Sequence, residues 1–135
     1  MKILDILFED AKKNLPDGGD CFDSAYDFIL KNGKENSNLI LVHGIVSGHG
    51  ELSGYRFTHA WCEDDEFVYD NSNNRVVKIP KIIYYSIGNI NPEQSKTYTY
   101  RDVLTKSNEQ KNKGPWDIEN VVYKEKFDTK TRKYN

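Results

Sequence analysis

The sequence lacks the features that usually hold a small secreted or metal-bound domain together. It has only two cysteines among 135 residues, Cys21 and Cys62, and their wide separation argues against a disulfide framework. A zinc site built from these cysteines and the three histidines would contain no close ligand pair such as C-x-x-C. We therefore expect no metal and no other cofactor.

Long apolar runs and an excess of one charge are also missing. No window approaches the roughly 20 apolar residues of a membrane-spanning helix. The opening stretch "MKILDILFEDAKKNLP" carries Asp5, Glu9 and Asp10, which the hydrophobic segment of a signal peptide would exclude. The net charge is −2 with both signs interspersed, so no basic surface for nucleic acid is indicated. We expect a cytoplasmic protein that binds neither membranes nor nucleic acid. The sequence favours no particular oligomeric state.

A chain of this length fits one compact domain, and we expect residues 1–135 to form a single unit of α+β class. Apolar spacing predicts a helix over residues 3–14. It predicts a second helix in which Asp20 is the cap, Cys21 is the first helical residue and Asn32-Gly33 is the end. The run "LILVHGIVSG" predicts a strand covered on both faces. Further expected elements are a strand at "RVVKIP", a short helix at "KIIYYSIG", a capped helix from Thr99 to Asn112, an edge strand at "VVYKEKF" and a frayed tail over 128–135.

The segment "FTHAWCEDDEFVYDNSNN" predicts a hairpin, because aromatic and β-branched residues flank the acidic pair Asp64-Asp65. With the turn centred between those two residues, His59 lies directly opposite Asp70. Directly opposed residues point to the same face with Cβ atoms roughly 4.5 to 5.5 Å apart, so the carboxylate can accept a hydrogen bond from the imidazole. This register predicts a base beside its orienting acid, and it sends Cys62 to the opposite face as a core residue.

Cys21 follows two glycines and opens an amphipathic helix in "GDCFDSAYDFIL". A thiol is a nucleophile only as thiolate, and the positive end of a helix favours that anion. The nearby carboxylates of Asp17, Asp20 and Asp23 oppose it, so an imidazolium beside the thiol must outweigh them. Buried free cysteines are common in cores, and the position of Cys21 alone does not separate the two interpretations.

The chain thus has G-x-C at a helix start, a valine-rich strand ending in "VSG", "HAW" on a second strand, and an Asp ending a third. Over residues 19–74 this order resembles the transglutaminase-like core of the papain-like cysteine enzymes. The resemblance implies a nucleophile helix packed on an antiparallel sheet, with Cys21 as nucleophile, His59 as general base and Asp70 as third member of the triad. It implies cysteine-dependent hydrolysis or acyl transfer at amide bonds of a protein or peptide. Peptidase, amidase, deamidase and transglutaminase activities all stay open.

A second hypothesis is a catalytically silent scaffold that binds a protein partner. Its surface would be the aromatic residues around Trp61, Tyr84, Tyr85 and Trp116. We expect Trp116 itself to pack back as a core anchor after its Gly-Pro turn. Of the two other histidines, His43 is expected to be a satisfied core residue and His49 a solvated residue of a glycine-rich loop.

Overall fold

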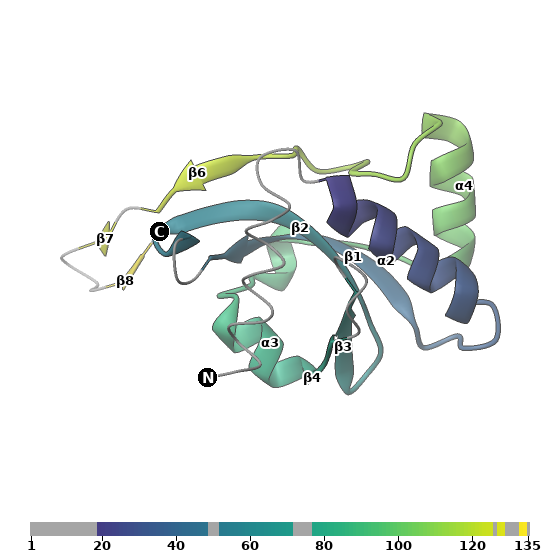
Figure 1. Cartoon of the computed structure of the whole chain (residues 1–135), viewed down its shortest axis with the longest axis horizontal. Coiled ribbons are helices and arrows are strands. Elements are labelled where there is room, and N and C mark those ends of the chain that lie inside the picture. Colours follow the sequence, from purple (N-terminus) through teal and green to yellow (C-terminus); the bar gives the residue numbers. More distant parts are fainter. Residues whose placement is uncertain (1–18, 49–51, 72–76, 126, 129–132, 135) are drawn as a thin grey trace.

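A computed structural model describes residues 19–48, 52–71, 77–125, 127–128 and 133–134. In this part of the chain an antiparallel sheet carries helices on both faces (Figure 1), which confirms the expected α+β class. The helical elements are α2 (Gly19–Asn32), α3 (Lys81–Ile87), the short 3-10 helix η3 (Pro92–Gln94) and α4 (Tyr100–Gln110). The strands are β1 (Ile40–Ser47), β2 (Tyr55–Glu63), β3 (Phe67–Asp70), β4 (Val77–Pro80), β5 (Lys96–Tyr98), β6 (Val122–Lys124), β7 (Phe127–Asp128) and β8 (Lys133–Tyr134). The helix expected over residues 3–14, and His49, lie outside the described residues.

The main sheet has six strands in the order β4-β3-β2-β1-β5, with β6 paired to β2. β1 runs antiparallel to β2 from Ile40 opposite Glu63 to Ser47 opposite Arg56. Along its other edge, β2 pairs with β6 at residues 55–57 and with β3 at residues 62–63. Residues 59–61 therefore lie where the edge of β2 passes from one partner strand to the other.

Two cores cover the two faces of the sheet. On one face, α2 packs Phe22, Ala25 and Ile29 against strand residues that include Leu41 and Cys62, and α4 adds Val103. On the other face, Tyr84 of α3 packs with Val42, Phe57 and Trp61. Successive strand residues point to opposite faces, which is why Leu41 and Val42 belong to different cores. The expectation that "LILVHGIVSG" forms a strand covered on both faces is confirmed.

Helix α2 begins at Gly19, so Cys21 is its third residue rather than its first, and Asp20 is inside the helix rather than its cap. A carboxylate in the first turn is favourable to the helix dipole, so the helix extends past the expected boundary. Cys21 still lies in the first turn, whose backbone N–H groups have no partner within the helix.

The β2–β3 hairpin forms, but its predicted register is wrong by two residues. Cys62 lies opposite Tyr69 and Glu63 opposite Val68, so the turn is centred between Asp65 and Glu66. The cause is the side chain of Asp64, whose Oδ1 accepts the backbone N–H groups of Glu66 (2.9 Å) and Phe67 (2.8 Å). Aspartate that bonds the backbone in this way occupies the first corner of a turn, not its centre. Continuing the register places Asp70 opposite Trp61 instead of His59.

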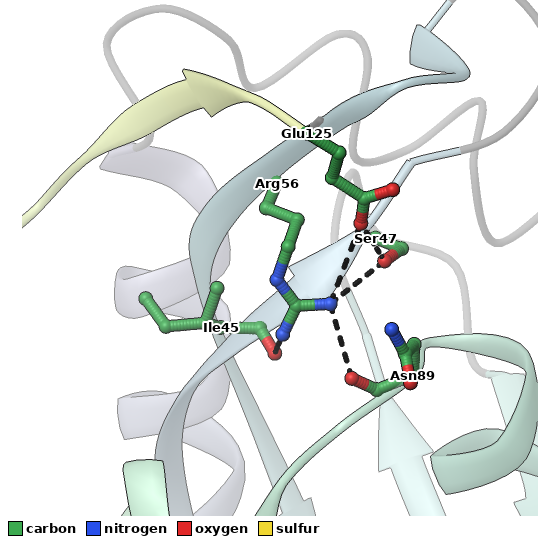
Figure 2. Close-up of polar contacts among 5 residues, drawn as sticks. All are labelled: Ile45, Ser47, Arg56, Asn89 and Glu125. Carbon is green, nitrogen blue, oxygen red and sulfur yellow. Dashed lines mark hydrogen bonds and ion pairs between the residues drawn. The ribbon is translucent and has the colours of Figure 1, made fainter. Parts of the chain in front are cut away.

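Strand β6 is joined to the sheet by a buried arginine (Figure 2). Arg56 of β2 is 5% exposed and donates to the Ser47 hydroxyl (2.8 Å) and to the carbonyls of Asn89 (3.1 Å) and Ile45 (3.3 Å). The carboxylate of Glu125, one residue beyond β6, lies 3.5 Å from the same guanidinium and accepts a hydrogen bond from Ser47. Because a buried charge is costly without such partners, this network ties the end of β6 to β1, β2 and the loop after α3.

The downstream elements were largely expected from the sequence. The strand at "RVVKIP", the short helix at "KIIYYSIG", the capped helix and the edge strand correspond to β4, α3, α4 and β6. In the C-terminal segment expected to be a frayed tail, β7 pairs with β8 in a short hairpin, with Phe127 opposite Tyr134. None of the described helices is long and apolar enough to cross a membrane.

Candidate active site

Three side chains from separate elements meet beside residues 59–61. Cys21 comes from the first turn of α2, His59 from β2 and Asp70 from the last position of β3. All three are buried, with exposures of 2%, 3% and 1% respectively. The structure therefore brings together the three residues that the sequence singled out.

The imidazole of His59 is held by the carboxylate of Asp70. His59 Nε2 lies 2.8 Å from Asp70 Oδ2, and both side chains are buried. The two residues are diagonal rather than opposed neighbours on the same face, and long side chains reach across such a diagonal. The rings of Phe57 and Trp61, with centroids 6.0 Å and 6.2 Å from that of His59, flank the imidazole on this face. Ring packing and the hydrogen bond together orient His59.

The thiol of Cys21 is hydrogen-bonded to His59. Since Nε2 faces Asp70, Nδ1 is the ring nitrogen left for the sulfur. Burial acts to lower the pKa of His59. The negative charge of Asp70, that of Cys21, and hydrogen bonds to both outweigh burial and raise this pKa well above 6.5. The environment thus favours a protonated imidazole that has the Asp70 carboxylate on one side and the Cys21 side chain on the other.

Tyr84 of α3 is a further member of this cluster. Its hydroxyl donates to Asp70 Oδ2 at 3.0 Å, the same oxygen that faces His59. The sequence assigned Tyr84 and Trp61 to an exposed binding surface, and this was wrong, because both are buried in the core between the sheet and α3. The seven residues of α3 are too few for apolar periodicity to distinguish Tyr84 from Tyr85, so no sequence pattern signalled it.

Cys62 does not belong to this cluster. Its side chain is fully buried on the opposite face and donates to the carbonyl of Ala25 at 3.3 Å, so the prediction of a core residue is confirmed. Burial, followed by the charges of Asp70 and Glu63, raises the pKa of Cys62 far above that of a free thiol. Cys62 therefore stays protonated and unreactive.

His43 is buried as expected, but it is not satisfied. Neither ring nitrogen has a hydrogen-bond partner among the described residues. The rings of Phe22, Tyr98 and Trp116 lie 5.0, 5.1 and 5.1 Å from its own, so Trp116 does pack back as predicted. Burial lowers the pKa of His43 to about 4, against the opposing charge of Asp117. The expected hydrogen bonds are missing because the sheet face around His43 is aromatic.

No group of three or more metal-binding side chains occurs in the described part of the chain. A surface cavity of about 390 Å³ lies at the β2–β3 turn, and its lining includes Asp64, Glu66 and Lys78 but none of Cys21, His59 and Asp70. The carboxylate of Asp64 is already bonded to the turn backbone and to Tyr69. The chemistry-bearing cluster is therefore separate from this cavity.

A thiol, an imidazole and a carboxylate in this sequence of contacts can carry out nucleophilic catalysis, with the third group orienting the base. The chain matches no protein-family model, and it has no significant match among curated proteins or among solved structures.

Proposed function

We propose that the protein is a cysteine enzyme of the papain-like, transglutaminase-like type that hydrolyses or transfers acyl groups at amide bonds. The observation that carries the proposal is the chain of contacts from Cys21 through His59 to Asp70. The surroundings of each member support its proposed role: the thiol lies in the first turn of a helix, the imidazole lies between the thiol and a carboxylate, and that carboxylate is buried and accepts hydrogen bonds from His59 and Tyr84. The substrate class is a protein or peptide.

In the acylation step, the Cys21 thiolate attacks the carbonyl carbon of the amide and forms a carbon–sulfur bond. Backbone N–H groups in the first turn of α2 stabilise the negative charge that develops on the carbonyl oxygen. His59 gives its Nδ1 proton to the amide nitrogen, the carbon–nitrogen bond breaks, and the amine leaves. The product is a thioester on Cys21 and a neutral His59.

In the second step, the deacylation, the proton moves in the opposite direction, toward His59. Neutral His59 takes a proton from water, and the resulting hydroxide displaces Cys21 to release an acid. If an amine takes the place of water, the product is a new amide. Hydrolysis, deamidation and transamidation therefore share the same residues, and the acceptor decides between them.

Alkylation with iodoacetamide across a range of pH tests the proposal. We expect Cys21 to react well below pH 8.5, the pKa of a free thiol, and faster than Cys62. His59→Ala should abolish the low-pH reaction of Cys21, whereas Cys62→Ala should leave it unchanged. Peptide mapping by mass spectrometry assigns each adduct to its cysteine.

A screen of amide and glutamine peptides, with and without an added amine, then identifies the products by mass. Loss of all turnover in Cys21→Ala is the expected result. Equal, slow alkylation of Cys21 and Cys62, together with no turnover in the screen, would refute the enzyme and favour a catalytically silent binding scaffold.

A further inference from the structure

Two donors converge on a single oxygen of Asp70. His59 Nε2 approaches Oδ2 from β2 at 2.8 Å, and the Tyr84 hydroxyl approaches the same atom from α3 at 3.0 Å. Both donors are almost fully buried, so water does not compete for either hydrogen bond. An acceptor that is shared between two donors binds each more weakly than it would bind one alone.

The surroundings of Tyr84 keep its hydroxyl protonated and directed toward Asp70 as a hydrogen-bond donor. Its ring packs against Trp61 with centroids 5.3 Å apart, which fixes the direction of the hydroxyl. Burial, followed by the charge of Asp70 and the hydrogen bond to it, raises the pKa of Tyr84 well above 10. Tyr84 therefore acts as a hydrogen-bond donor to Asp70 and is not a candidate base.

We propose that Tyr84 is a positioning residue of the active site, which shares Asp70 Oδ2 with His59 and so sets how tightly Asp70 holds the imidazolium. The inference rests on the proposed function. During acylation His59 must give its Nδ1 proton to the leaving amine. Without the hydrogen bond from Tyr84, the carboxylate would stabilise the imidazolium more strongly and make it a weaker acid.

Tyr84 also stabilises the Asp70 carboxylate after His59 has become neutral. At that stage Asp70 has lost its cationic partner while it is still buried, and the cost of a buried carboxylate rises. The hydrogen bond from Tyr84 persists and keeps the carboxylate ionised and in place for the second step. Among the described residues, the charge of Asp70 also acts on Cys62 of β2, which supplies no positive charge.

The test is Tyr84→Phe, with Tyr85→Phe as the matched control. Tyr85 lies on the same helix, its ring also packs against Trp61 at 6.1 Å, and its hydroxyl also donates to a buried carboxylate, Glu63 Oε1, at 2.5 Å. Each variant removes one hydroxyl from a tyrosine–carboxylate pair, which is buried for Tyr84 and half-buried for Tyr85. Only Tyr84→Phe removes a hydrogen bond to Asp70.

Nitrogen-15 NMR of His59 is the first readout, because it needs no turnover. In Tyr84→Phe we expect the pKa of His59 to rise by about 0.5 to 1 unit, and the Nε2 proton signal to move downfield as the remaining hydrogen bond strengthens. With a substrate, kcat should fall by about 5- to 20-fold at unchanged KM. Tyr85→Phe should change neither the NMR signals nor kcat.

Equal effects of the two variants on the pKa of His59 would overturn the inference, since both would then act only through packing. In an Asp70→Asn background, Tyr84→Phe should cause no further loss, and an additional full loss would also overturn it. The proposed function fails separately. If no amide is turned over and Cys21 and Cys62 are alkylated equally and slowly, but Tyr84→Phe alone shifts His59, the shared-oxygen geometry is supported and the enzyme assignment is refuted.

Discussion

His43 should make the protein sensitive to mild acid, and His43→Leu should remove that sensitivity. The imidazole is fully buried, and rings of Phe22, Tyr98 and Trp116 surround it. Gly114 completes the enclosure so closely that a Cβ there would lie 2.6 Å from His43 Cε1. Because neither nitrogen has a partner in the described part of the chain, the site has no acceptor for the protons of an imidazolium.

The size and sign of the effect follow from the pKa. Burial lowers the pKa of His43 from 6.5 to about 4, although Asp117 opposes the shift. The unfolded chain therefore takes up this proton near pH 6.5 and the folded protein only near pH 4, so stability is full above pH 6.5 and falls as the pH drops from 6.5 to 4. A difference of roughly 2.5 units corresponds to a total loss of about 3 kcal/mol.

Urea unfolding of the wild type and of His43→Leu between pH 7.5 and pH 4.5 measures this loss. Leucine fills a similar volume and has no proton to take up, so the free-energy difference between the two proteins should grow in favour of the variant by most of that amount. Groups shared by both proteins cancel in the difference. A difference that stays constant over the whole pH range would refute the reasoning, because His43 would then titrate alike in the folded and unfolded chains.

Three further predictions concern the site and its supports. Asp70→Asn should fold normally, as judged by circular dichroism, but lose roughly two to four orders of magnitude in kcat/KM, since the amide can stabilise the wrong imidazole tautomer. Arg56→Lys should destabilise the protein to urea by about 2 kcal/mol, because the single nitrogen of lysine cannot replace Nη1, which contacts Ser47, Asn89 and Glu125, and Nη2, which donates to Ile45 (Figure 2). The exposed Arg101→Lys should have no measurable effect. Asp64→Ala removes the acceptor of two turn amides and should cost about 1 kcal/mol by the same measurement, and an unchanged midpoint would contradict the role given to this side chain.

The elements that local patterns determine could be predicted from the sequence. The patterns of apolar residues in α2 and β1 predict a helix and a strand without reference to the rest of the chain. The start of α4 is predicted by its cap, and the structure contains the capping box of Thr99 and Asp102. β5 was missed because only Tyr98 among its three residues is buried. A strand this short is defined by its partner: it exists because β1 offers a free edge to residues 96–98. No local pattern carries that information.

The candidate site could be predicted for a different reason, which the hairpin makes clear. The predicted turn was centred one residue too early, so each residue of β3 was paired with the wrong residue of β2, two positions away from its true partner. Because side chains along a strand alternate between the two faces with a period of two, an error of two positions leaves every side chain on its correct face. Asp70 therefore stayed on the face of His59 although it lost its place directly opposite, and a diagonal contact replaced the direct one. A shift by a single residue would have turned Asp70 to the other face. What the sequence predicted was thus the face and the approximate distance along the strand, and these suffice for a pair of long side chains. The position of Tyr84 depends instead on how α3 docks against the sheet, which involves contacts between residues far apart in the chain, and so its hydrogen bond to Asp70 could be found only in the folded structure.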